Sequence, residues 1–195
     1  QASYKINEVK FLIAGQKGVG KTKLVNSFLE TAFTEKKKGV NFFAKNFDKH
    51  TRVKIWKLEG EYFKEEYLRI YSQGVHVIVF VYNAFKLESF LAIDQIIELL
   101  KRNKKFSGKI VLIDNSYSEF EPQVPHELCE LVCKSFKASF FKFDAALKNS
   151  FLKKKLKNFY KSIVEKGKKI MIKVKDNFLF KSKKNKPLLK KVQNA

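Results

Sequence analysis

The chain has 195 residues, a formal net charge of +22 and 45% hydrophobic residues. This apolar content excludes a disordered chain, and the length suits one domain with its own core. No apolar run approaches the ~20 residues that span a bilayer, and the first residues carry no secretory segment.

An apolar run over Glu8–Ala14 predicts the first strand, and apolar positions at helical spacing predict a helix over Lys21–Thr31. Between them, Gly15–Thr22 has the pattern G-x-x-x-x-G-K-[ST], which in this context predicts a phosphate-binding loop. Its glycines let backbone N–H groups point inward, and the helix N-terminus adds a positive dipole end. The predicted phosphate-binding residues are Gly15, Gln16, Lys17, Gly18, Val19, Gly20, Lys21 and Thr22.

Strand and helix patterns alternate along the rest of the chain, which predicts an α/β fold with a mostly parallel sheet. Val40–Asp48 and Arg52–Leu58 flank a turn at Asp48–His50, so we expect them to form an antiparallel hairpin. The later expected elements are a loop and helix in Glu59–Arg69, a buried strand over Val75–Tyr82, a helix over Leu87–Arg102, a strand over Lys109–Ile113, a helix ending near Phe136, a strand over Ser139–Phe143, and a last helix marked by Phe151 to Val164. We expect helices on both faces of the sheet.

Histidine and cysteine residues do not form an arrangement typical of a metal or nucleophilic site. We expect His76, inside the predicted buried strand, to be a core histidine with a satisfied hydrogen bond. Cys129 and Cys133 lie four apart on a predicted helix without histidine partners, which favours core positions over a metal site. The sequence has no disulfide framework, so we expect an intracellular protein.

Positive charge is spread over residues 1–165 and over a tail, 166–195, that has one acidic residue, Asp176. This charge favours an acidic protein surface, RNA or anionic lipid as a partner. A genome with A/T-rich codons would also enrich Lys and Phe, and both explanations stay open. The scarcity of Arg argues against a dedicated nucleic-acid reader.

Over about residues 6–165 the chain resembles a small GTPase of the Ras superfamily, closest to the Rab branch. The resemblance depends on the phosphate loop and on four further segments: Gly39–Phe42, Ile55–Trp56 with Gly60, Tyr71–Asn83 and Glu88–Phe90. It implies a Ras-like P-loop G domain over 1–165, with a six-stranded sheet that has one antiparallel hairpin strand. A basic C-terminal extension, 166–195, would follow. The resemblance also implies GTP or GDP as the nucleotide.

Three positions depart from the chemistry of the family. The switch Thr that closes over Mg²⁺ corresponds to Lys37, the Asp that holds the Mg²⁺ shell to Lys57, and the Gln that orients water to Glu61. We therefore expect weak or absent Mg²⁺ at Thr22 and little or no GTP hydrolysis, with no catalytic residue left to assign.

The base-reading motifs depart as well. Asn115 remains as a base-binding candidate, but Ser118 takes the place of the guanine-binding carboxylate and Ala146 that of the last motif's Lys. Guanine selectivity should fall, because buried polar groups discriminate only when they are present.

Lys57 has two interpretations. With Lys17 and Lys21, it would neutralise a polyphosphate in place of the metal. In the alternative, the site has decayed and Lys57 points to solvent.

We expect a degenerate Rab-like GTPase that acts as a structural or protein-interaction subunit of a larger assembly with an acidic surface. An active GTP-binding molecular switch and an RNA-binding subunit of a ribonucleoprotein remain the alternatives. The resemblance implies a prenylated C-terminal Cys, but the chain ends Lys191–Ala195, so we expect no prenyl anchor.

Overall fold

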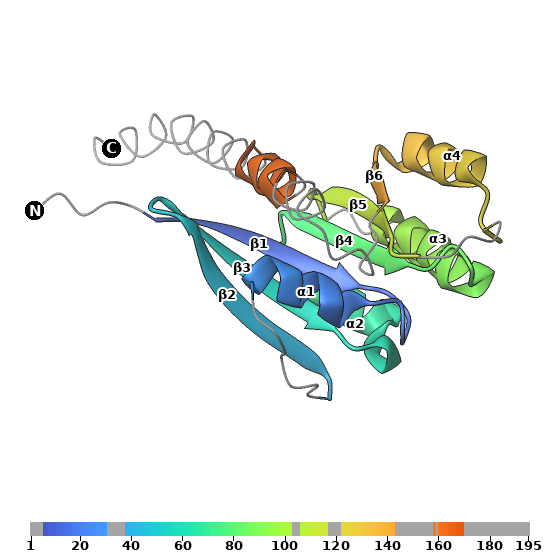
Figure 1. Ribbon diagram of the computed structural model, residues 1–195, viewed down its shortest axis with the longest axis horizontal. Coiled ribbons are helices and arrows are strands. Elements are labelled where there is room, and N and C mark those ends of the chain that lie inside the picture. Colours follow the sequence, from blue (N-terminus) through green and yellow to red (C-terminus); the bar gives the residue numbers. More distant parts are fainter. Residues whose placement is uncertain are drawn as a thin grey trace, which may run out of the picture.

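The computed structural model describes residues 6–30, 38–102, 106–116, 122–142, 158 and 160–169. Its strands form one six-stranded sheet in the order β2-β3-β1-β4-β5-β6 (Figure 1). The strands are β1 (Asn7–Ala14), β2 (Val40–Asp48), β3 (Thr51–Leu58), β4 (Val77–Tyr82), β5 (Lys109–Asp114) and β6 (Ser139–Lys142). Neighbours pair in parallel except β2 and β3, which pair antiparallel. The predicted α/β fold and its hairpin are confirmed.

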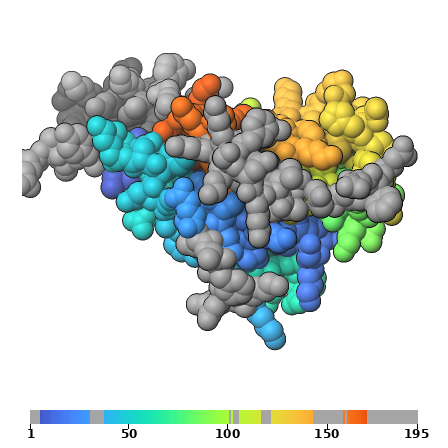
Figure 2. All heavy atoms as spheres, viewed as in Figure 1, coloured from blue at the N-terminus to red at the C-terminus, as the bar shows by residue number. Residues whose placement is uncertain are grey.

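Helices cover both faces of this sheet, as expected. The helices are α1 (Lys21–Leu29), a 3₁₀ turn η1 (Gly60–Tyr62), α2 (Glu65–Tyr71), α3 (Leu87–Arg102) and α4 (His126–Phe136), and residues 160–169 are also helical. Helices α2, α3 and α4 contribute to one apolar cluster, and α1 and residues 160–169 to another. Figure 1 shows α1 beside β1 and β3. In the space-filling view of Figure 2, the tip of the β2–β3 hairpin and α4 lie at opposite sides of the molecule.

The central strand β4 explains why two layers of helices are needed. All six of its residues are buried, because α1 and α3 belong to apolar clusters on opposite faces of the sheet. A strand in this position must be apolar along its whole length. His76 lies just before this strand and is half-buried, which corrects its placement inside it. Its Nδ1 accepts the Lys10 backbone N–H at 2.9 Å, so the expected satisfied hydrogen bond is present.

A hydroxyl group ties α1 to the C-terminal helical residues 160–169. Tyr160 donates to the Leu24 carbonyl at 2.7 Å, its hydroxyl also contacts Ser27 Oγ, and its ring packs edge-on against Phe28. Two residues expected in the core, Cys129 and Cys133, are a buried and a partly buried free thiol.

Parts of the expected architecture lie outside the described residues. These are residues 151–157 of the predicted last helix and residues 170–195 of the basic extension. Within the described ranges, none of the helices combines the length and the apolar character needed to cross a membrane.

Candidate functional site: the phosphate loop and the end of β3

The loop between β1 and α1 has a shape that requires glycine. Gly18 and Gly20 have φ angles of 83° and 94°, in the left-handed region that favours glycine. A Cβ on Gly15 would collide with the Val81 carbonyl oxygen, and a Cβ on Gly20 with the Asn115 side chain. The loop therefore lies tightly against the carboxyl ends of β4 and β5, at the N-terminus of α1, where backbone N–H groups favour an anion.

Lys21 lies inside this loop. Its Nζ donates to the carbonyl oxygens of Gly15 at 2.8 Å and Gln16 at 2.7 Å, and the residue is 5% exposed. Burial lowers the pKa of Lys21 to about 8, with Glu59 opposing and Lys57 adding to this change. An anion bound in the loop would favour the charged form of Lys21, because opposite charge raises the pKa of an ammonium group.

Lys57, near the end of β3, points into the same site. Its residue is fully buried, and its Nζ donates to Thr22 Oγ1 at 3.0 Å and lies 2.6 Å from Glu59 Oε1. Asn41 on β2 donates from Nδ2 to the same Glu59 oxygen at 3.3 Å. The alternative in which Lys57 points to solvent is therefore wrong.

Sequence reasoning did not identify Glu59 and Asn41 as partners of this lysine. A usable signal was present, because Lys57 is in phase with Val53 and Ile55, which are buried. Strand alternation places these three side chains on one face. A lysine on a buried face needs a nearby carboxylate, and Glu59 follows two residues later.

Glu61 lies on the exposed side of the site. Its carboxylate is 3.5 Å from Lys17 Nζ, and both side chains are largely exposed. Gly60 approaches the Lys17 backbone so closely that a Cβ there would collide with it. The segment after β3 therefore packs against the phosphate loop, and Glu61 is beside it.

Asn115, just after β5, joins the region of the predicted base site to the phosphate loop. Its backbone N–H donates to the Tyr82 carbonyl at 2.9 Å, and its Nδ2 donates to the Val19 carbonyl at 2.8 Å. Its Oδ1 is buried and has no hydrogen-bond partner among the described residues. This acceptor and the glycine loop fit a nucleotide. Lys37, Ser118 and Ala146 lie outside the described residues.

A buried ammonium group lies beside the hydroxyl that was predicted to bind Mg²⁺. Thr22 Oγ1, the predicted metal-binding hydroxyl, accepts a hydrogen bond from a buried ammonium group, and a second cation there would be repelled.

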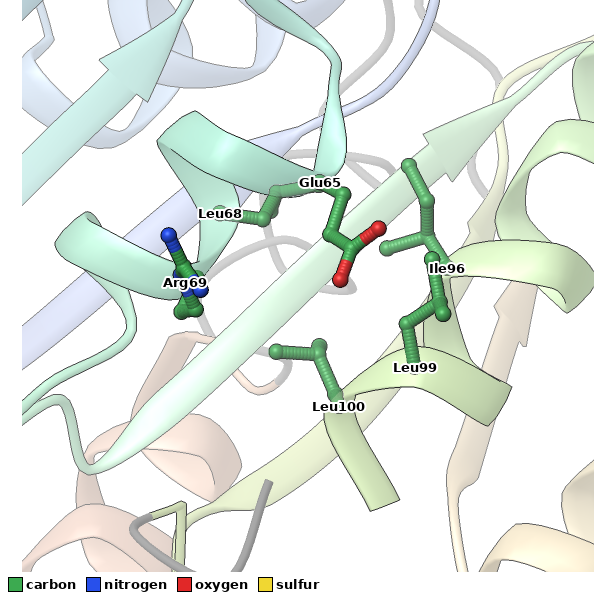
Figure 3. A pocket seen from close by; sticks show the side chains of 6 residues that line it. All are labelled: Glu65, Leu68, Arg69, Ile96, Leu99 and Leu100. Carbon is green, nitrogen blue, oxygen red and sulfur yellow. The ribbon is translucent and has the colours of Figure 1, made fainter. Parts of the chain in front are cut away.

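A separate small pocket lies between α2 and α3 (Figure 3). Its volume is ≈ 30 Å³, which is room for two or three water molecules at about 10–15 Å³ each. Glu65, Leu68 and Arg69 line it from α2, and Ile96, Leu99 and Leu100 from α3. It is too small for a nucleotide and includes none of the predicted site residues.

The sheet order and the glycine loop between β1 and α1 define a P-loop protein of the α/β class. Residues 10–170 match the model of the Ras family, and the chain belongs to this family. It is 33% identical to the Ras-related protein Rab-33A of Mus musculus over 88 residues. This stretch is 42% of this chain and 37% of the relative.

Two further relatives carry Rab names. The Ras-related protein Rab-12 of Homo sapiens is 26% identical over 114 residues, which are 55% of this chain and 47% of the relative. The Ras-related protein Rab-7b of Paramecium octaurelia is 30% identical over 99 residues, 48% of each chain. The matched stretches span less than half the length of these relatives.

Proposed function

We propose that this chain is an intracellular, nucleotide-binding member of the Rab-like branch that hydrolyses GTP slowly or not at all. It would act as a structural or protein-interaction subunit. The phosphate loop supports nucleotide binding, because its glycines, Lys21 and the N-terminus of α1 are arranged to receive an anion.

The observation that carries the proposed loss of hydrolysis is Glu61. It occupies the position of the water-orienting Gln of the family and lies beside Lys17 of the phosphate loop. A carboxylate accepts hydrogen bonds but does not donate them, whereas an amide does both. An anion here also repels the charge that develops on the transferred phosphoryl group, and phosphoryl transfer depends on positioning and charge stabilisation.

The basic surface supports the second part of the proposal. A net charge of +22 favours association with an acidic partner and makes that association sensitive to salt. We therefore propose an acidic protein surface as the partner.

Nucleotide content and turnover test this function directly. The purified chain is denatured, and the released nucleotide is identified by chromatography. Single-turnover hydrolysis of γ-labelled GTP then compares the wild type with Glu61→Gln and with Lys57→Asp/Glu61→Gln. We expect a bound guanine nucleotide, negligible wild-type hydrolysis and measurable hydrolysis in the double variant. Glu66→Gln on α2 is the matched control and should change nothing.

Rapid hydrolysis by the wild type would contradict the proposal and favour the second candidate, an active GTP-binding switch. The intact glycine loop is the observation that favours a switch. A switch also requires a partner whose affinity differs between the GTP and GDP forms.

The subunit role is tested by partner binding. Lys21→Ala should leave assembly with the partner intact, because the interaction is proposed not to depend on nucleotide. Loss of assembly in a folded Lys21→Ala variant would contradict this role. Assembly that ribonuclease abolishes would instead indicate an RNA-binding subunit.

A further inference from the structure

The backbone of the sheet fixes the position of the Lys57 ammonium group. Lys57 is paired with Ile13 of β1 on one side and with Asn41 of β2 on the other. Ile13 lies two residues before the phosphate loop begins. The sheet register therefore places the Lys57 side chain at the base of the loop. The side chain is fully buried and ends on Thr22 Oγ1, in the first turn of α1.

The charges around Lys57 favour an anion. Lys57 and Lys21 are both buried, and the charge of Lys57 helps to lower the pKa of Lys21. The nearest carboxylate, Glu59, is 24% exposed at its side chain and is shared with Asn41. Two buried ammonium groups with one partly solvated carboxylate leave positive charge at the helix N-terminus, where a polyphosphate would restore the balance.

The hydrogen-bonding capacity of Lys57 leads to the same conclusion. An ammonium group has three donors. Among the described residues, two of these are used, by Thr22 and Glu59. One donor remains for a phosphate oxygen, and the Thr22 hydroxyl keeps its own proton to donate.

We propose that the Lys57 ammonium takes the place of a divalent cation, so that the chain binds the polyphosphate of a nucleotide without Mg²⁺. This inference rests on the nucleotide binding proposed above and adds how that site is neutralised. Glu59 is the internal competitor, because the bound phosphate and this carboxylate share one cation.

Nucleotide affinity in magnesium and in chelator tests the inference. GTP and GDP are titrated into the nucleotide-free full chain by calorimetry, once with excess Mg²⁺ and once with EDTA. We expect the dissociation constants in the two buffers to agree within about threefold, which corresponds to less than the free energy of one hydrogen bond. An affinity that falls tenfold or more in EDTA would overturn the inference and leave proposed nucleotide binding standing.

Two variants assign the effect to Lys57. Lys57→Met keeps the length and removes the charge, and it should weaken GTP binding in EDTA about tenfold or more through loss of a charge-assisted hydrogen bond. Lys54→Met, on the same strand but paired with Glu8, is the matched control and should leave affinity unchanged. Glu59→Gln should tighten binding in EDTA severalfold, because it removes the competing anion. If Lys57→Met does not fold, the wild-type comparison and Glu59→Gln still decide the question.

Each remaining result contradicts a different statement. Unchanged GTP affinity in a folded Lys57→Met variant would overturn the role of Lys57, as would weaker binding in Glu59→Gln. No binding of GTP or GDP in either buffer would overturn this inference and the proposed nucleotide binding together.

Discussion

The phosphate loop and the end of β3 lie against each other, but they are built from different parts of the chain. The loop depends on backbone shape: positive φ angles at Gly18 and Gly20 and close approaches at Gly15. The end of β3 depends on side chains, chiefly the contact of Lys57 with Thr22. The shape of the loop is preserved as long as its glycines are preserved. At the end of β3, in contrast, one substitution is enough to reverse the charge of the site. The difference teaches that a substitution at the end of β3 can change the charge of the site while the shape of the loop is kept.

Breaking the backbone part should have the largest effect. In Gly15→Ala, the new Cβ would collide with the Val81 carbonyl oxygen, and φ is 151°. We expect the unfolding free energy, measured by urea denaturation, to fall by about 3 kcal/mol. Nucleotide binding, measured by calorimetry, should be lost as well. Gly18→Ala is the control, because φ is 83° there but nothing lies within 4 Å of the added Cβ. It should cost about 1–2 kcal/mol. Equal losses in the two variants would contradict the close-approach argument.

Lys21 is the side chain on which the loop's function depends most. Lys21→Met removes a buried charge that donates to Gly15 and Gln16, so GTP affinity should fall about 10- to 100-fold. The unfolding free energy should not fall, since burial disfavours the ammonium form. Lys23→Met, at an exposed position of the same helix, should change affinity less than about threefold. Calorimetry checks both affinities, and equal effects would contradict a special role for Lys21.

A smaller effect is expected at Tyr160, which contacts α1. Tyr160→Phe removes the hydroxyl that donates to the Leu24 carbonyl while keeping the ring against Phe28. We expect a loss of about 1 kcal/mol in unfolding free energy by urea denaturation. The partly exposed Tyr62, whose ring packs on Tyr67, provides the control Tyr62→Phe, with a change of less than about 0.5 kcal/mol. No loss in Tyr160→Phe would show that the hydroxyl contributes nothing to docking.

The smallest expected effect concerns pH at His76. Burial, and then the charge of Lys10, hold the pKa of His76 below its ordinary value of 6.5. Because protonation is less favourable in the folded chain, His76 contributes full stability above pH 6.5 and loses it as pH falls through the folded pKa. Urea midpoints measured across this range should therefore decline less steeply in His76→Gln, whose amide oxygen can still accept from Lys10. Identical pH profiles in the variant and the wild type would contradict this.

Much of the fold was predictable because its signals are local. The bounds of β2 and α3 agree with the sequence patterns, and the ends of β1, β3 and β5 differ by one residue. The predicted strand at Val75 starts two residues later, at Val77. Apolar side chains extend beyond the region of strand pairing, so the pattern overestimates the strand.

The backbone part of the site was predictable from its motif, whereas the side-chain part left a weaker signal in the alternation of β3. The pattern Gly15–Thr22 indicated the loop because glycine spacing encodes its shape. The direction of the Lys57 side chain depends on the strands beside β3 and on its ion pair with Glu59. No sequence motif specifies that pair. The hydrogen bond from Asn115 to Val19 joins residues that are 96 positions apart, a relation set by the order of β1, β4 and β5 in the sheet.

The Tyr160 hydroxyl connects α1 to the C-terminal helical residues 160–169. Nine residues of α-helix span about 13.5 Å, and such a short rod transmits displacement with little bending. Its N-terminal end adjoins the phosphate loop, and its middle and last turn contact Tyr160 of the helical residues 160–169 through Leu24 and Phe28. A displacement of α1 would therefore be passed to the helical residues 160–169 through this hydrogen bond.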